Sequence, residues 1–173
     1  MKKIGIILII IISIFLTTAC GNKNEANKMN TIQYDGEYLG TLELSYPRNV
    51  GFSIKEDTNE RGKTMEFYSY DHPIIFLIQL DMMNKDEYQK QIKKELKNDY
   101  AKEYTWNGYK GVALLEEDQG AFRVLLKEEN DAAIYINGQI RRNQDYSNTA
   151  SIKDMFNKKA IQDLLNSMKY EKK

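Results

Sequence analysis

The chain has 173 residues, and 25 lysine and arginine residues balance 25 aspartate and glutamate residues. Charges of both signs are interspersed along the chain, without the basic patch that is typical of nucleic-acid binding. One cysteine and one histidine exclude an intramolecular disulfide and leave no ligand pair for a zinc site. We therefore expect no nucleic-acid partner, no metal and no cofactor.

The first residues have the pattern of an export signal. Lys2 and Lys3 form a positive start, and an apolar run over residues 4–16 follows, interrupted only by Gly5 and Ser13. A helix of that length spans about 20 Å, whereas the hydrocarbon core of a membrane is about 30 Å thick. The run is therefore too short for a transmembrane helix and suits a signal peptide.

Small residues follow and lead to Ala19-Cys20-Gly21. This segment resembles a lipobox, although Thr17 stands where leucine is commonest. The resemblance implies diacylglyceryl transfer to the Cys20 sulfur and cleavage between Ala19 and Cys20. Two fatty chains suffice for lasting membrane attachment, since each buried methylene contributes about 0.8 kcal/mol. We expect residues 1–19 to be a lipoprotein signal peptide. The alternatives are a secretory signal with an incidental cysteine and a short uncleaved anchor.

Cleavage there would leave a lipid-anchored protein on the extracytoplasmic face of the cell membrane. Loss of Lys2 and Lys3 reduces the 25 basic residues to 23 against 25 acidic ones, a net charge of −2. Residues 20–30 hold one large apolar side chain, so we expect a lipidated N-terminus and a flexible tether. Residues 31–173 suit a single domain. Abundant Lys, Asn, Ile and Tyr are typical of an AT-rich genome and favour a Gram-positive host.

The first half of the domain contains several runs of residues that are typical of β-strands. Asp35-Gly36 is a strong hairpin signal between two of them, and Pro47 is expected to break the chain after the second. The run after Pro73 is the most apolar and is expected to form a central strand. The predicted strands of this half are 31–34, 38–44, 50–55, 64–69 and 74–80.

A helix is predicted next. Asn84 can cap its start, and Glu87 three residues later completes a capping-box-like arrangement. Apolar residues recur every four positions and form a narrow stripe on a highly charged helix. The stripe consists of Tyr88, Ile92, Leu96 and Tyr100, so we expect a surface helix that lies on a sheet.

The remaining pattern predicts four strands and a closing helix. The strands are 102–106, 111–116, 121–127 and 132–136, with turns at Asn107-Gly108, at Gly120, over 128–131 and at Asn137-Gly138. The helix has Asn157 as its expected cap, Phe156 as a staple, and an apolar face of Ile161, Leu164, Leu165 and Met168. The order predicts an α+β fold in which two main helices pack on an antiparallel sheet.

Three segments give the domain a family resemblance. They are residues 45–54 with Tyr46-Pro47 and Gly51-Phe52, the turn Gly108-Tyr109-Lys110-Gly111, and residues 164–168 near the C-terminus. Together these resemble the PsbP-like and DcrB-like group of α/β/α sandwiches, although that group usually has its proline after the glycine-phenylalanine strand. The resemblance implies an accessory or assembly factor that works by binding.

Two groups of residues bear on catalysis and metal binding. Asp71-His72 could prepare a general base, but the sequence offers no obvious nucleophile, and a turn before Pro73 explains His72 more simply. The acidic runs 116–118 and 128–131 lack the spacing of a calcium loop and suit solvated turns. No catalytic residue is predicted.

A possible binding patch comprises aromatic residues and an arginine pair. Tyr104 and Trp106 share one strand face, and the Asn107-Gly108 turn brings Tyr109 beside them. Exposed, these rings would form a stacking platform, and buried, they would be a core cluster. Arg141 and Arg142 could contact phosphates of lipids or cell-wall polymers, or simply end a solvated strand.

The sequence thus predicts a non-catalytic binding or accessory module of the cell envelope, whose partner is an unknown protein or cell-wall component. The alternatives are an envelope hydrolase with a site built from carboxylates or tyrosines, and a surface lipoprotein of a phage or mobile element.

Overall fold

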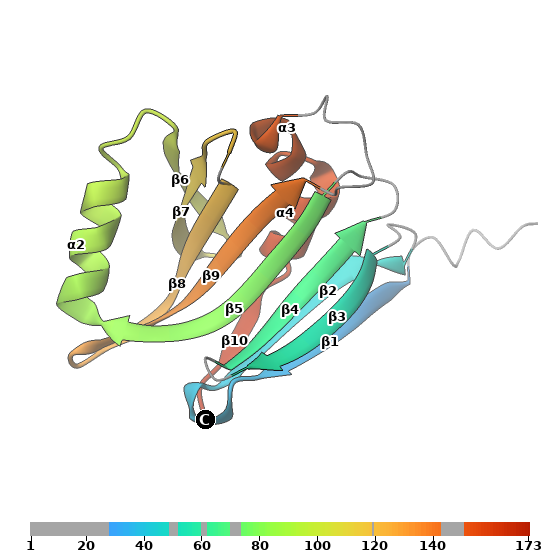
Figure 1. Ribbon diagram of the computed structural model, residues 1–173. Coiled ribbons are helices and arrows are strands. Elements are labelled where there is room, and N and C mark those ends of the chain that lie inside the picture. Colours follow the sequence, from blue (N-terminus) through green and yellow to red (C-terminus); the bar gives the residue numbers. More distant parts are fainter. Residues whose placement is uncertain (1–27, 49–51, 60–61, 70–73, 119, 143–150) are drawn as a thin grey trace, which may run out of the picture.

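The computed structural model describes residues 28–48, 52–59, 62–69, 74–118, 120–142 and 151–173. The expected signal peptide, Cys20, most of the tether and His72 lie outside these residues. The chain has an α+β fold, as predicted, with two antiparallel sheets instead of one (Figure 1).

The larger sheet has seven antiparallel strands in the order β3-β4-β5-β9-β8-β7-β6. Its two longest strands, β5 and β9, pair along their full length at the centre of the sheet. The strands are β3 (Phe52–Asn59), β4 (Gly62–Ser69), β5 (Ile74–Asn84), β6 (Ala101–Trp106), β7 (Tyr109–Leu115), β8 (Gly120–Glu129) and β9 (Ala132–Arg142).

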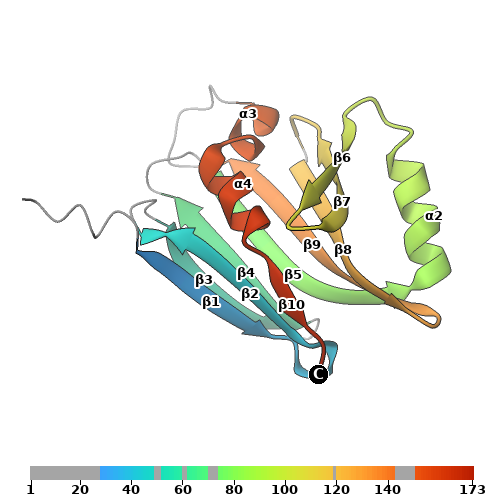
Figure 2. The same ribbon diagram turned by 180° about the vertical axis from the view of Figure 1, so that it is seen from behind.

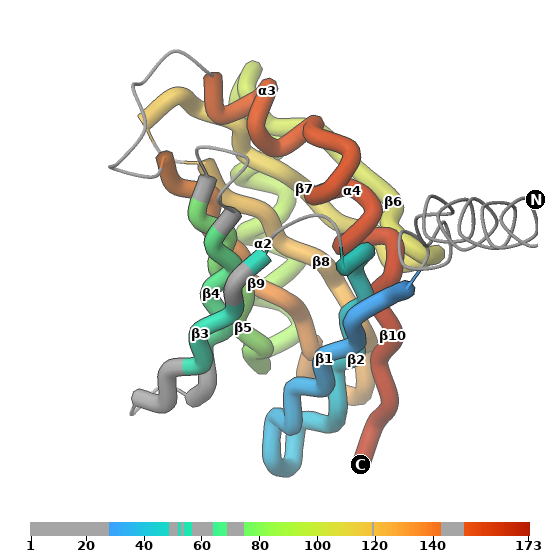
Figure 3. Tube along the Cα trace, turned by 90° about the vertical axis from the view of Figure 1, so that its right-hand side faces the viewer, coloured from blue at the N-terminus to red at the C-terminus, as the bar shows by residue number. Residues whose placement is uncertain are grey.

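The smaller sheet and two helices cover one face of the larger sheet (Figure 2). This smaller sheet has the order β1-β2-β10 and forms a separate layer beside β3, β4 and β5 (Figure 3). Its elements are β1 (Met29–Asp35), the 3₁₀ helix η1 (Glu37–Leu39), β2 (Thr41–Pro47) and β10 (Lys169–Glu171), and the helices are α3 (Ile152–Phe156) and α4 (Lys159–Asn166). A third helix, α2 (Lys85–Glu95), packs on the opposite face.

Between these layers lies the main hydrophobic core. Alternate residues of β5 and β8 point into it, and the Phe76 and Phe122 rings stack there with centroids 4.8 Å apart. Phe156 of α3 and Phe67 of β4 are also fully buried. Burying each such ring contributes about 1.5–3 kcal/mol, so this covered face supplies most of the hydrophobic stabilisation.

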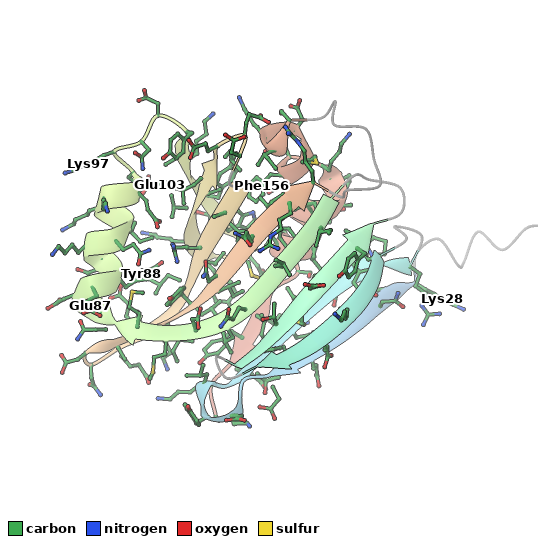
Figure 4. The ribbon with its side chains drawn as sticks, viewed as in Figure 1. Lys28, Glu87, Tyr88, Lys97, Glu103 and Phe156 are labelled. Carbon is green, nitrogen blue, oxygen red and sulfur yellow. The ribbon has the colours of Figure 1, made fainter. Side chains whose placement is uncertain are left out.

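The second hydrophobic cluster is small and holds α2 on the sheet. Tyr88 packs on Ala133 and Tyr135 of β9, with Ile92 and Leu125 at the margin. In Figure 4, Tyr88 lies on the side of α2 that faces the sheet. This cluster is confined to the region around Ala133 and Tyr135, so α2 covers only part of this outer face.

The predicted start of α2 is confirmed, and its predicted end is wrong. The Asn84 side chain accepts hydrogen bonds from the backbone N–H groups of Asp86, at 2.9 Å, and Glu87, at 3.4 Å. The helix stops at Glu95, since a turn through Asn98 leads into β6. Leu96 and Tyr100 therefore leave the apolar stripe and are 38% and 37% exposed.

The predicted turn at Asn137-Gly138 is also wrong, because β9 continues without interruption to Arg142. Gly138 lies against the Phe122 ring, and a Cβ atom there would come within 1.7 Å of Phe122 Cζ. The glycine therefore makes room for an aromatic ring. Asn107-Gly108, by contrast, forms the expected hairpin turn with φ angles of 48° and 84°.

Near the C-terminus, a short helix that was not predicted, α3, precedes the predicted one, α4. Ser151 caps α3 by accepting a 3.0 Å bond from Asp154 N. Asn157, the expected N-cap, is instead the C-cap of α3, and Lys158 precedes α4. The apolar face of the predicted helix is confirmed, since Ile161, Leu164 and Leu165 are all buried.

Two features of the smaller sheet differ from the prediction. β2 runs on to Pro47, which pairs with Met29. A proline is tolerated there because β10 pairs only with residues 41–43, so no described strand needs a hydrogen bond from Pro47 on its other side. The strand β10 itself was not predicted.

Candidate functional site

The predicted aromatic platform is part of the core. Trp106 is 1% exposed, and its Nε1–H donates to Gln162 Oε1 at 3.0 Å. Tyr104 stacks on Trp106 with ring centroids 5.1 Å apart. Tyr109 is half-buried against the core, and its hydroxyl accepts from Tyr170 N at 3.1 Å. These three residues form no exposed stacking surface, since α3 and α4 cover this face of the sheet.

The two arginines of the predicted patch diverge. Successive side chains of a strand point to opposite faces, so Arg141 joins the outer face and Arg142 points the other way. Arg141 is exposed beside Gln139, whereas Arg142 Nη2 donates to Glu117 Oε2 at 2.6 Å. The arginines therefore cannot act as a pair.

On the outer face of the larger sheet, no described element covers β4, β5 and β9 beyond the end of α2 (Figure 1). Most side chains that line the hollow there are polar, and Leu77 and Ala121 are also part of it. The strand register aligns one row of polar side chains across β4, β5, β9 and β8: Thr64, Gln79, Asn137 and Arg123. Beside this row, Glu66, Gln139 and Arg141 border the same hollow. The hollow is a groove of about 530 Å³, within the usual size range of small-ligand sites.

The two amides on β9 have a defined orientation. Arg123 Nη1 donates to Asn137 Oδ1 at 3.3 Å, and Arg141 Nε donates to Gln139 Oε1 at 2.9 Å. Both carbonyl oxygens are therefore engaged by guanidinium groups. No described residue accepts from the NH₂ groups of Asn137 and Gln139 or from Arg141 Nη1. The β9 side of the groove thus presents hydrogen-bond donors.

An ion pair between α2 and the sheet holds Arg123 in place. Its Nε lies 2.8 Å from Glu95 Oε1, and the two side chains are 17% and 11% exposed. Gln91 Nε2 donates to the same Glu95 oxygen at 3.2 Å. The buried Glu95 Oε2 atom has no partner among the described residues. An unpaired buried oxygen is costly, so the Arg123 contact has to compensate for it.

Asp81, next to this ion pair, is a partly buried carboxyl group. It faces Tyr135 across the β5–β9 ladder and accepts from Gln79 Nε2 at 3.2 Å. Burial raises the pKa of Asp81, and the nearby Arg123 opposes the rise. Burial also raises the pKa of Tyr88 to about 12, so its hydroxyl is protonated at neutral pH.

The acidic run 116–118 lies in the predicted turn, whereas Glu128 and Glu129 belong to the end of β8 and only Asn130 and Asp131 form the next turn. Glu117 pairs with Arg142 and accepts from Ile152 N at 3.3 Å, and Glu128 lies 3.0 Å from the Lys85 ammonium group. Glu129 binds both Lys127 and Lys172, and these hydrogen bonds lower its pKa. Among the described residues, no group of three His, Cys, Asp or Glu side chains is placed to hold a metal ion.

Sequence reasoning identified Arg141 and missed most of the groove. Asn137, Gln139 and Arg141 alternate with Gly138 and Ile140, a two-residue period that the turn prediction at Asn137-Gly138 obscured. Thr64, Gln79 and Arg123 are far apart in the sequence, and only the pairing of β5 with β9 brings them into one row.

Comparison with known proteins identifies no family. No protein-family model matches the chain, and no curated protein matches it. A crystal structure at 1.50 Å resolution of a protein from Bacteroides thetaiotaomicron VPI-5482 is similar, with a TM-score of 0.45 and 17% identity. The match covers 83% of this chain and 48% of that one, so the chain spans about half of its length. In the part that the structure describes, none of the helices has the length and apolar character needed to cross a membrane.

Proposed function

We propose that this protein is a lipid-anchored, extracytoplasmic module that binds a partner through the uncovered polar face of its larger sheet and catalyses no reaction. The observation that carries the proposal is the groove of about 530 Å³, whose donors on β9 have no described partner. Polar groups on a protein surface that have no hydrogen-bond partner within the protein are available to a ligand.

The membrane part of the proposal is supported by the N-terminal sequence. Lys2-Lys3, the short apolar run and Ala19-Cys20-Gly21 together have the order of a lipoprotein signal peptide. Lys28, where the described chain begins, lies on the opposite side of the molecule from α2 (Figure 4). An anchor attached beyond Lys28 would therefore leave the α2 side directed away from the attachment point.

The non-catalytic part of the proposal is supported by the side chains of the groove. Amides, a hydroxyl group and guanidinium groups line it, together with one carboxylate, Glu66, and the apolar side chains of Leu77 and Ala121. Among the described residues that line the groove, no Ser, Thr or Cys side chain is hydrogen-bonded to a base, and the Glu66 carboxylate accepts instead from the phenol of Tyr68. Asp81 is the carboxyl group with a raised pKa in this region, and its own hydrogen-bond donor is an amide.

Photo-crosslinking in intact cells tests this proposal. A photoreactive amino acid at Gln139, in the groove, should yield a discrete crosslinked product. The matched control at Gln33, an exposed glutamine of β1 on the smaller sheet, should not. Asn137→Ala in the Gln139-labelled protein should abolish the product, because it removes a donor from the same groove. Equal products from both positions, or none from Gln139, would contradict the proposal.

A further inference from the structure

We propose that the groove binds an extended peptide with a free C-terminal carboxylate, laid along β9 and ending at Arg141. This inference rests on the proposed function and names the class of ligand. It is drawn from the orientation of the amides, their spacing along the strand and the charges on either side of the groove.

The orientation of the amides selects a ligand that accepts hydrogen bonds. Asn137 and Gln139 turn their carbonyl oxygens onto Arg123 and Arg141, at 3.3 and 2.9 Å, which leaves their NH₂ groups as the outward-facing functions. Arg141 adds a donor in the same line, because no described residue accepts from its Nη1 atom. Peptide carbonyl groups are acceptors of the matching kind.

The spacing of these donors fits an extended chain. Asn137, Gln139 and Arg141 lie at every second position of β9, so their backbone positions repeat at about 6.7 Å. In an extended peptide, the carbonyl groups that point to one side also recur every two residues, at about the same interval. The run from Asn137 to Arg141 covers about 13 Å, which corresponds to about four residues of an extended ligand.

The strand pairing of β9 determines how such a peptide would be recognised. β5 occupies one edge of β9 and β8 occupies the other, so β9 has no free edge to which a strand could be added. The peptide would therefore lie on top of the sheet and be recognised by side chains. This differs from strand addition, in which main-chain hydrogen bonds supply the affinity.

The charges favour a zwitterionic ligand over a polyanion. Arg141 offers an exposed guanidinium group, which pairs well with a carboxylate. Glu66 borders the groove from β4, two strands away from Gln139, and the Tyr68 hydroxyl donates to one of its oxygens. A carboxylate at that position repels a polyanion and attracts an ammonium group. Because Glu66 is level with Gln139 and not with Asn137, it would meet a cationic side chain in the middle of the peptide, while the C-terminal carboxylate meets Arg141.

The test uses the full-length protein solubilised in detergent and immobilised. The probe is a pool of tetrapeptides, randomised at all four positions and carrying free C-terminal carboxylates. The comparator is the same pool with amidated C-termini, and polyglycerol phosphate serves as a polyanionic competitor. We expect the acid pool to be retained about 3- to 5-fold more than the amide pool, because an ion pair with the exposed Arg141 contributes up to about 1 kcal/mol.

Arg141→Ala should remove that preference, whereas Arg142→Ala should leave it intact. Arg142 is the matched control, since it is the neighbouring arginine and pairs with Glu117 away from the groove. Equal retention of the two pools, preferential binding of polyglycerol phosphate, or equal effects of the two variants would overturn the peptide assignment. If the Gln139 crosslink persists in those cases, only the ligand class fails and the proposed function stands.

Discussion

At the scale of single residues, the Glu95–Arg123 pair joins α2 to the polar row of the sheet. Arg123→Ala removes the cation that pairs with the buried Glu95 carboxylate, whose Oε2 atom already has no described partner. We therefore expect this variant to lower the free energy of unfolding by about 3 kcal/mol in urea titrations at pH 7. Glu95→Gln in the same background should recover part of the loss, because no uncompensated charge then stays buried. A loss below about 0.5 kcal/mol, which is ordinary for exposed pairs, would contradict this role.

Asp81 makes the stability of the folded state depend on pH, and the direction of that dependence follows from its pKa. Burial raises the pKa of Asp81 above its ordinary value of 3.8, so the folded state favours the protonated carboxyl group. The stability that this group contributes is therefore present at low pH and is lost as the pH rises through the folded-state pKa. Asp81→Asn should unfold at a higher temperature than the wild type at pH 7, and the difference should shrink as the pH falls towards 3.8. A difference of the opposite sign at pH 7, or one that does not change with pH, would contradict the assignment.

At the scale of elements, two glycines that look alike in the sequence have different roles. Gly138→Ala places a methyl group against the Phe122 ring, so it should lower the free energy of unfolding by about 3 kcal/mol or more through overpacking. Gly108→Ala is the matched control, since the Cβ atom would meet open space and only the φ of 84° is unfavourable. That variant should lose about 1–2 kcal/mol. Equal losses in chemical denaturation would show that Gly138 is not held against the ring.

The local elements could be predicted from the sequence, and their pairing could not. The Asn84 cap, the Asn107-Gly108 turn and the apolar face of α4 depend on neighbouring residues, and all three are confirmed. The smaller sheet joins strands near residues 30, 45 and 170, which no local pattern connects. The same limit applies to the candidate site, because the polar row exists only through the pairing of β5 with β9.

At the scale of the whole molecule, the covered face of the larger sheet stabilises the fold, and the binding role that we propose belongs to its other face. Trp106→Ala removes a fully buried ring between the sheet and α3, so we expect it to lower the free energy of unfolding by about 3–5 kcal/mol. Tyr38→Ala is the matched control, since Tyr38 is 80% exposed and should be nearly neutral. Thermal denaturation of both variants distinguishes these effects, and an unchanged melting temperature for Trp106→Ala would contradict its place in the core.

The proposed role depends on the side of the cytoplasmic membrane on which the domain lies. Residues 1–21 carry the whole argument for export and lipid attachment, and the groove can meet an envelope partner only if the chain is outside the cytoplasm. The most direct measurement is the mass of the N-terminal peptide of the protein purified from its host membranes. We predict a peptide that begins at Cys20 and carries a diacylglyceryl group on its sulfur. An intact leader, or a Cys20 with a free thiol, would contradict the account.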